Sequence, residues 1–242
     1  MKNRLILLGL AGIASLLSTS CTARRDVASD VTPPNQVADF DVLFAQNCAG
    51  CHGSRGRDGA AIALADPVFL AITDDATIRR VAAHGMFGTP MRAFAQSAGG
   101  MLTDTQIDIL VRGIRAWANP EVVRGVALPS YAAAGEADPE RGAEVFRSYC
   151  SSCHGTDGSG GRAGSIVDGS YLALVSNQNL RLSVILGRPA SGAPDWRNDI
   201  PGQPLSEQQI TDVVAWLASR RAEIPGQPYP MSVMNQTVGG VR

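Results

Sequence analysis

The sequence predicts an all-α fold in which two small helical domains follow one another along the chain. Three observations support this prediction. The second half of the chain repeats the first, each copy closes with an amphipathic helix, and the many glycine and proline residues (26 and 14) favour short helices joined by turns. With 242 residues, the chain is long enough for two such domains.

The internal repeat appears when the second half is laid on the first at a shift of 102 residues. The matched pairs include Cys48 and Cys150, Cys51 and Cys153, His52 and His154, Phe44 and Phe146, Gly59 and Gly161, and Asp66 and Asp168. At a shift of 103, "LTDTQIDILVRGI" (102–114) lies on "LSEQQITDVVAWL" (205–217). Such matches favour duplication, and they predict domains at 39–119 and 138–222 joined by a linker at 120–137.

Each copy has the same expected helices at its two ends. The segments "DFDVLFAQNC" and "PERGAEVFRSYC" predict a short helix before each cysteine pair, and in the second copy Asp138 and Pro139 have the pattern of an N-cap and first helical residue. Each closing helix is expected to begin with a capping box: Thr103 with Gln106, and Ser206 with Gln209. Apolar residues at helical spacing then predict a buried face.

The N-terminus has the pattern of an export signal. A basic "MKNR" precedes the apolar run "LILLGLAGIASLL" (5–17), which is short for a membrane span, and "STSC" then resembles a bacterial lipoprotein cleavage box. The box usually has leucine three residues before the cysteine, where this chain has Ser18. We expect a lipoprotein-type signal at 1–20, lipidation of Cys21, a tether at 21–38 and an irregular tail at 223–242. An ordinary secretory signal with a spare cysteine is the alternative.

Two short motifs hold four of the five cysteines: "NCAGCHG" (47–53) and "YCSSCHG" (149–155). A thioredoxin-type redox pair belongs near a βαβ pattern, which the sequence lacks. A shared zinc site would leave the histidine after each second cysteine unexplained. A disulfide across two intervening residues is strained.

The pattern CxxCH is instead typical of covalent c-type haem attachment, in which two thiols add to the vinyl groups of one porphyrin and the adjacent histidine ligates the iron. The sequence therefore predicts two haem c groups. Cys48 and Cys51 would hold haem 1, and Cys150 and Cys153 would hold haem 2. His52 and His154 are the expected proximal ligands of the two irons.

With these residues, the chain resembles class I cytochrome c in a tandem dihaem form. The resemblance covers about 39–119 and 138–222, and it rests on "FAQNCAGCHG" with "GTPMRAF" and on "FRSYCSSCHG" with "GAPDWR", each followed by its closing helix. It implies that the two terminal helices of each domain cross beside the haem. It also implies that Met91, in "GTPMRAF", is the sixth ligand of haem 1. Met86 and Met101 are rivals, for which packing within the loop is the simpler interpretation.

The second copy departs from the family pattern because Ala193 stands at the position of Met91. Three interpretations remain open: a tail methionine (Met231 or Met234) ligates haem 2, its iron is five-coordinate or carries water, or it binds an external ligand. Lysine is excluded because Lys2, in the signal, is the only one. His84 is expected to be a polar loop residue or a contact of a haem propionate.

The resemblance implies an electron carrier. We expect a dihaem cytochrome on the periplasmic face of the membrane, held by its lipid. Its expected role is subunit or dedicated partner of a membrane redox complex, such as a quinol-oxidising complex, a terminal oxidase or a dehydrogenase. The alternative is a dihaem oxidoreductase, peroxidase-like or acting on sulfur compounds, that uses an open iron site at haem 2. The net charge of −1 gives no indication of nucleic-acid binding. Seven arginines are candidates to pair with haem propionates: Arg55, Arg57, Arg79, Arg92, Arg162, Arg181 and Arg188.

Overall fold

The computed structural model describes residues 32–197, 200 and 202–222. Cys21, Met231 and Met234 lie outside these residues. The chain divides into two units, Met1–Val37 and Ala38–Arg242. The described part of the first unit contains one short 3₁₀ helix, η2 (Pro34–Gln36). No helix within the described ranges combines the length and apolarity needed to cross a membrane.

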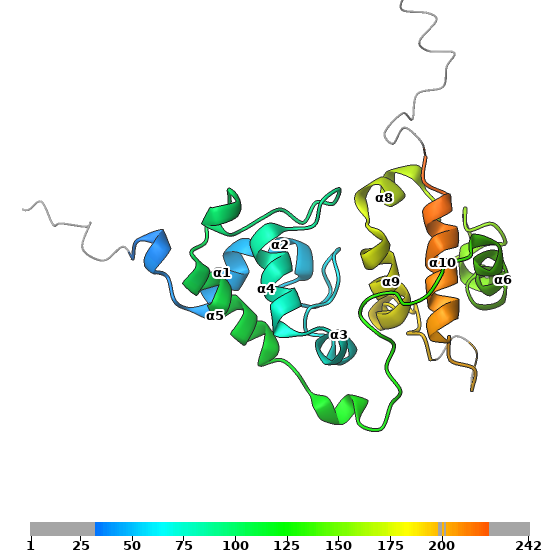
Figure 1. The fold of residues 1–242 in the computed structure, drawn as a ribbon, viewed down its shortest axis with the longest axis horizontal. Coiled ribbons are helices and arrows are strands. Elements are labelled where there is room, and N and C mark those ends of the chain that lie inside the picture. Colours follow the sequence, from blue (N-terminus) through cyan, green and yellow to red (C-terminus); the bar gives the residue numbers. More distant parts are fainter. Residues whose placement is uncertain (1–31, 198–199, 201, 223–242) are drawn as a thin grey trace, which may run out of the picture. The chain divides into compact units, whose positions relative to one another are not determined.

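All regular elements within the described ranges of the second unit are helices, as the sequence predicts (Figure 1). The first repeat contains α1 (Phe40–Asn47), α2 (Ala49–His52), α3 (Pro67–Ile72), α4 (Asp75–His84), η3 (Gln96–Ala98) and α5 (Asp104–Arg115). The second repeat contains α6 (Pro139–Tyr149), α7 (Ser151–His154), α8 (Gly169–Leu174), α9 (Asn177–Leu186), η5 (Pro189–Ser191) and α10 (Glu207–Ser219). The 3₁₀ helix η4 (Pro120–Val123) lies between the repeats.

The predicted helix starts are confirmed. Both capping boxes form, with the hydroxyl of Thr103 or Ser206 accepting from the N–H of the glutamine three residues on, and the glutamine side chain accepting from the N-cap N–H. The Asp138 carboxylate caps α6, and Pro139 stands at its first position. These contacts satisfy N–H groups that have no partner inside a helix, which fixes where each helix begins.

In each repeat, the first and last helices cross at a glycine, but the glycine lies on opposite helices. A Cβ on Gly113 of α5 would lie 2.0 Å from the ring of Phe40 on α1. A Cβ on Gly142 of α6 would lie 2.0 Å from the carbonyl oxygen of Asp212 on α10. At the repeat shifts, Phe40 corresponds to Gly142, and Gly113 corresponds to Trp216. The large residue therefore lies on the first helix in the first repeat and on the last helix in the second repeat. Both arrangements let two helices approach closely.

Tryptophans fill corresponding places in the two cores although they come from different positions of the closing helix. Trp117, just after α5, packs edge-on against Phe44 at 5.0 Å between ring centroids. Trp216, within α10, stacks on Phe146 at 4.1 Å. Each indole also lies against a glycine of the loop after the CxxCH motif, Gly56 or Gly158. The aromatic cluster therefore ties that loop to the helix crossing in both repeats.

The linker is held against the second repeat by a buried arginine. Arg181 of α9, only 1% exposed, donates to the carbonyl oxygens of Ser130 (2.9 Å) and Tyr131 (3.2 Å) and pairs with Glu207. Because an arginine is rarely this buried without partners, these contacts explain its position. Because these contacts occupy its guanidinium, Arg181 is not a partner for a haem propionate, a role for which the sequence made it a candidate.

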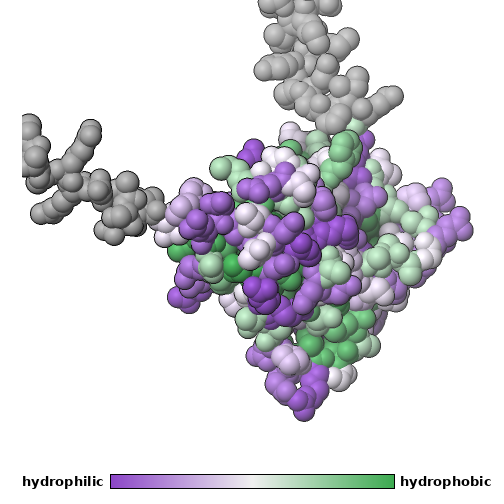
Figure 2. Space-filling model, turned by 60° about the vertical axis from the view of Figure 1, so that its left-hand side comes forward, coloured by the Kyte–Doolittle hydropathy of each residue, from purple (hydrophilic) through white to green (hydrophobic). Residues whose placement is uncertain are grey.

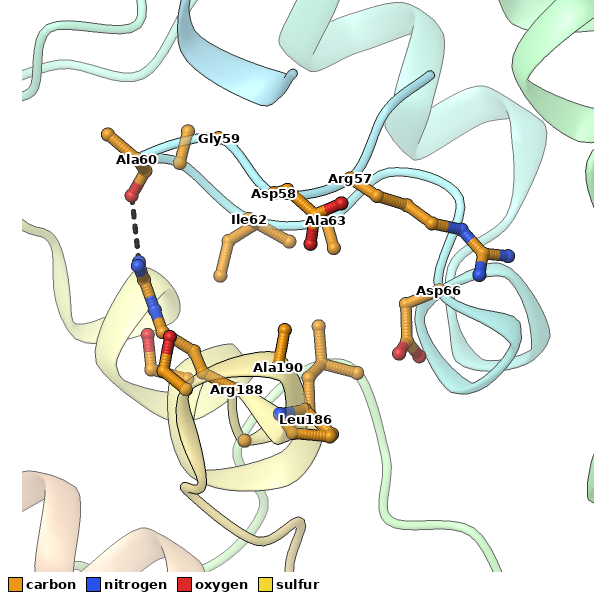
Figure 3. A pocket seen from close by; sticks show the side chains of 15 residues that line it. Arg57, Asp58, Gly59, Ala60, Ile62, Ala63, Asp66, Leu186, Arg188 and Ala190 are labelled. Carbon is orange, nitrogen blue, oxygen red and sulfur yellow. Dashed lines mark hydrogen bonds between the residues drawn. The ribbon is translucent and has the colours of Figure 1, made fainter. Parts of the chain in front are cut away.

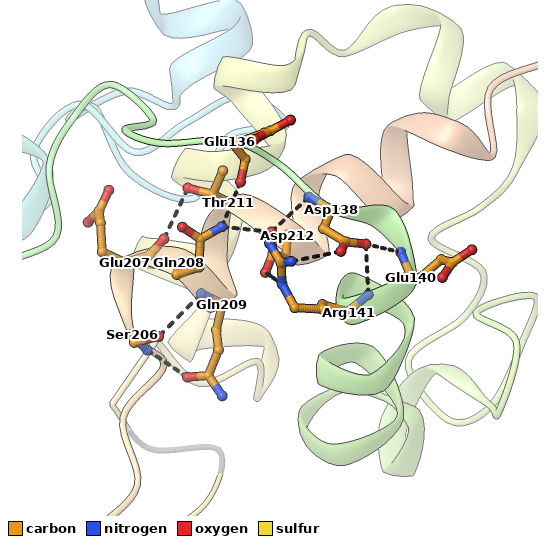
Figure 4. Close-up of polar contacts among 10 residues, drawn as sticks. All are labelled: Glu136, Asp138, Glu140, Arg141, Ser206, Glu207, Gln208, Gln209, Thr211 and Asp212. Atoms are coloured by element: carbon orange, nitrogen blue, oxygen red, sulfur yellow. Dashed lines mark hydrogen bonds and ion pairs between the residues drawn. The ribbon is translucent and has the colours of Figure 1, made fainter.

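A buried carboxylate joins α10 to the start of α6 (Figure 4). Asp212 accepts hydrogen bonds from Arg141 Nε (2.9 Å), from the Asp138 N–H (2.9 Å) and from Gln208 Nε2 (2.8 Å). Burial raises the pKa of this carboxyl, but the hydrogen bonds together outweigh burial, so its pKa lies below the ordinary value. The charged form of Asp212 therefore stabilises the second repeat.

We expect replacement of Asp212 by asparagine to reduce the free energy of unfolding of the second repeat by about 2 kcal/mol at neutral pH. The folded pKa is depressed, so the stabilisation is complete above the unfolded value of about 3.9 and is lost as the pH falls through the folded pKa. Urea unfolding of the haem-loaded protein between pH 3 and 7 measures this. The variant should lose less stability on acidification than the wild type. Parallel pH profiles of the wild type, the variant and the exposed control Glu140→Gln would contradict the assignment.

Candidate haem sites

Each CxxCH motif forms one helical turn at the end of a longer helix. Cys48 ends α1, and its carbonyl oxygen accepts from the N–H groups of Cys51 (3.2 Å) and His52 (3.0 Å). Cys150 ends α6 in the same way, with Cys153 and His154 donating at 3.2 and 3.0 Å. This turn fixes the separation of the two cysteines in both repeats, as attachment of both to one porphyrin requires.

A loop returns over each motif, and we name residues 53–66 and 155–168 the attachment loops. In the first loop, the Ala61 N–H donates to the Cys51 carbonyl oxygen at 2.9 Å. A Cβ on Gly59 would lie 2.2 Å from that same oxygen, so only glycine fits. The second loop repeats this arrangement with a 3.0 Å bond from the Ala163 N–H to the Cys153 carbonyl oxygen. The glycine match found in the sequence thus reflects a close backbone approach.

Both motif histidines are oriented by a carbonyl of the attachment loop. His52 Nδ1 donates to the Ile62 oxygen at 2.7 Å, and His154 Nδ1 donates to the Gly164 oxygen at 3.0 Å. A proton fixed on Nδ1 leaves Nε2 with its lone pair for a metal, the usual arrangement of a ligating imidazole. Burial lowers the pKa of His52, which favours the neutral ring that ligates iron. The residues present therefore fit a haem. Sequence reasoning missed the two carbonyl partners, because backbone groups carry no signature in the sequence.

The first cysteine lies in an environment that favours the protonated thiol. Burial, and secondarily the neighbouring Cys51, raise the pKa of Cys48 to about 12. Disulfide exchange uses the thiolate, which a lowered pKa favours. This environment therefore disfavours a reactive redox thiol at Cys48.

We name residues 85–94 and 187–196 the distal loops. In the first, the Met86 N–H donates to the Met91 carbonyl oxygen at 2.8 Å, and the Met91 N–H donates to Thr89 Oγ1 at 3.2 Å. Met91 is thus set in a hydrogen-bonded loop, and Ala193 stands at the matching place of the second distal loop. Met101 is 81% exposed, so it does not pack within its loop as the sequence suggested.

The candidate propionate partners divide by their contacts. Arg79 pairs with Asp104 and Asp108, and Arg181 is bonded to the linker, so other groups already occupy both guanidinium groups. Arg57 donates to the Ala65 oxygen at 2.9 Å within the first attachment loop. Arg162 donates to Cys153 Sγ at 3.0 Å, so it lies beside a haem-attachment position. His84 is exposed at the end of α4.

A cavity of about 560 Å³ lies between the first attachment loop and the second distal loop (Figure 3). Its lining comes from residues 57–63 and 66 on one side and 183 and 186–191 on the other. Across it, Arg188 donates to the Ala60 carbonyl oxygen at 2.7 Å. The cavity therefore brings the loop that orients His52 beside the loop that contains Ala193, a juxtaposition that sequence reasoning did not anticipate.

In comparisons with known proteins, each repeat is similar to a cytochrome family. Residues 139–221 match the family described as "Cytochrome c", and residues 35–112 match "Cytochrome C oxidase, cbb3-type, subunit III". Curated relatives in Mycobacterium bovis and Mycobacterium tuberculosis, each named "Cytochrome bc1 complex cytochrome c subunit", are 25% identical over 226 residues. The matches cover 87% of this chain and 77% of the relatives.

Among solved structures, the Kuenenia stuttgartiensis reducing HAO-like protein complex contains a similar chain. It is 16% identical with a TM-score of 0.44, and the match covers 79% of this chain and all of that one. This similarity is too low to support any conclusion about function. The family matches, by contrast, fall on both CxxCH motifs and on their surrounding helices.

Proposed function

Because each repeat matches a model of a cytochrome family, we propose that this chain is a dihaem c-type cytochrome that transfers electrons in a respiratory chain. Domain 1 and domain 2 here denote the first and second repeats. We further propose that it acts on the periplasmic face of the membrane, anchored by lipid on Cys21, as a subunit or dedicated partner of a membrane redox complex.

The observation that carries this proposal is the repeated histidine geometry. In both domains a CxxCH turn is covered by an attachment loop whose carbonyl oxygen fixes the imidazole Nδ1–H. A haem held there supplies reversible one-electron exchange at iron. The protein residues hold the imidazole in its ligating tautomer, and the surrounding helices supply an apolar core. In domain 1, Met91 adds the thioether expected of an electron-transfer site.

The contact between the two domains supports an electron relay within one chain. Arg188 of the second distal loop reaches the carbonyl oxygen of Ala60 in the first attachment loop, so polypeptide surrounding one haem site touches polypeptide surrounding the other. Electron transfer between sites becomes faster as the sites come closer. A direct contact of this kind suits transfer within the chain better than two domains that move independently.

The names of the relatives indicate the kind of partner. The mycobacterial proteins are named as cytochrome c subunits of a bc1 complex, which favours a quinol-oxidising complex as the partner here. Docking cannot use a ring of lysines, since Lys2 is the only lysine. Phe87, at the tip of the first distal loop, is fully exposed, and apolar areas lie among the hydrophilic residues on the face shown in Figure 2. An apolar contact near haem 1 therefore suits the proposal.

Intact mass spectrometry of the mature protein, purified from an export-competent host under denaturing conditions, tests the cofactor and the anchor together. We expect the mass of the chain from Cys21 onward, increased by two haems and by a lipid modification. A polypeptide without added haem would overturn the dihaem assignment. A haem-loaded chain that lacks lipid would overturn only the anchor.

The carrier role is tested by electron transfer kinetics with the haem-loaded protein. We expect a purified quinol-oxidising complex to reduce it at a rate that depends on quinol, and Phe87→Ser to slow this reaction without altering the haem content. The exposed Val122→Ser, outside the distal loop, is the matched control. Steady turnover of peroxide with a reduced donor, faster than any reduction by the complex, would favour the alternative of a peroxidase-like enzyme.

A further inference from the structure

The second distal loop has the same backbone hydrogen bond as the first. Arg188 N–H donates to the Ala193 carbonyl oxygen at 2.9 Å, as Met86 N–H donates to the Met91 oxygen at 2.8 Å. Each loop begins with a glycine in the left-handed region, Gly85 (φ +71°) or Gly187 (φ +59°). Ala193 therefore occupies the position of Met91 in the structure as well as in the sequence.

The two loops also end in the same way. The carbonyl oxygen of Phe94 accepts from the Leu102 N–H (2.7 Å), and the carbonyl oxygen of Trp196 accepts from the Leu205 N–H (2.8 Å). Each aromatic residue lies nine positions after its loop glycine. The loops therefore have equal length, and no insertion in the second loop brings another side chain into the position of the ligand.

The side chains around Ala193 do not replace the missing thioether. Alanine has no lone pair to offer to iron. Residues 120–222 contain neither methionine nor lysine, and their one histidine is His154, which the proximal side uses. Asp195 is engaged by Arg197, with 2.6 Å between Oδ2 and Nη2, and the Arg197 guanidinium lies 4.8 Å from the Trp196 ring centroid.

We propose that the sixth position of haem 2 is a binding site for a small external ligand. Water would occupy it at rest. A neutral diatomic π-acceptor would displace water from ferrous iron, and a small anion would displace it from ferric iron. This inference rests on the proposed dihaem function, because it requires a haem on Cys150 and Cys153. The two domains would then differ. Haem 1 would keep two protein ligands, whereas haem 2 would keep one protein ligand and exchange its external ligand.

Ligand titration of the haem-loaded protein tests the site, after intact mass has shown two haems per chain. The probes are carbon monoxide for the reduced protein and cyanide for the oxidised protein. We expect one molecule of carbon monoxide to bind per chain, and electron paramagnetic resonance of the oxidised protein to show one high-spin and one low-spin haem. A chain with fewer than two haems would overturn the proposed function itself, whereas two haems that bind no carbon monoxide would overturn only this inference.

Restoring the thioether provides the decisive variant. Ala193→Met should convert the high-spin signal to low-spin and weaken carbon monoxide binding at least tenfold. Ala190→Met, an exposed position in the same loop, is the matched control and should leave both properties unchanged. Equal effects of the two variants would contradict a specific site at Ala193.

The tail methionines supply the competing outcome. If Met231 or Met234 ligates haem 2, the wild type will show two low-spin haems, and the double variant Met231→Ala/Met234→Ala will produce the high-spin signal. That result would overturn the inference. A double variant with the same spectrum and the same carbon monoxide affinity as the wild type would support it.

Discussion

Replacing Met91 by alanine will leave both haems attached but lower the reduction potential of haem 1 by on the order of 100 mV. The thioether of methionine stabilises ferrous iron, so its loss favours the oxidised form. Attachment is unaffected because Cys48 and Cys51 are unchanged and the distal loop keeps its bond from the Met86 N–H to the residue 91 oxygen. Spectroelectrochemical titration of the haem-loaded protein measures both potentials.

The matched control for this experiment is Met101→Ala. Met101 belongs to the same domain, and its side chain is exposed, so its removal should change neither potential. The Met91 variant should also bind a second molecule of carbon monoxide per chain, because its distal loop would then resemble that of domain 2. If its spectrum and potential equal those of the wild type, Met91 is not the ligand, and Met86 becomes the residue to test.

How much of this fold the sequence predicts depends on which groups form it. Capping side chains such as Thr103, Ser206 and Asp138 predict where the helices begin, and the structure confirms these starts. The repeat predicts two domains of one architecture, and this prediction is also confirmed. The carbonyl partners of the motif histidines could not be predicted, because any residue provides a carbonyl: Ile62 serves in one domain and Gly164 in the other.

The helix crossings show a second limit of sequence reasoning. The exchange of large and small residues, Phe40 with Gly113 in one domain and Gly142 with Trp216 in the other, breaks the residue match at both positions of the repeat. Only the short distances from a Cβ at Gly113 or Gly142 to the facing helix reveal that both pairs allow a close helix crossing. The same limit applies to the haem 2 site. The sequence shows Ala193 in place of methionine, but only the hydrogen bond from the Arg188 N–H to the Ala193 oxygen, matching that of Met86 and Met91, shows that the loop backbone is retained.

Replacing Gly142 by alanine is expected to destabilise domain 2 by about 3 kcal/mol, although glycine-to-alanine changes within helices ordinarily stabilise. The new Cβ would lie 2.0 Å from the Asp212 carbonyl oxygen, which belongs to the backbone of α10 and can move only if the two helices separate. Denaturant unfolding of the haem-loaded protein measures the loss. Gly169→Ala, at the first position of α8 with open space around it, is the control and should not destabilise.

The corresponding change in domain 1 should behave differently, because there the obstacle is a side chain. Gly113→Ala places its Cβ against the Phe40 ring, so the additional change Phe40→Ala should relieve most of the overlap. In domain 2, Trp216→Ala cannot relieve the overlap of Gly142→Ala with the Asp212 oxygen, and the two losses should add. Double-mutant cycles in both domains measure this contrast. Equal coupling energies in the two cycles would contradict this difference between a side-chain obstacle in domain 1 and a backbone obstacle in domain 2.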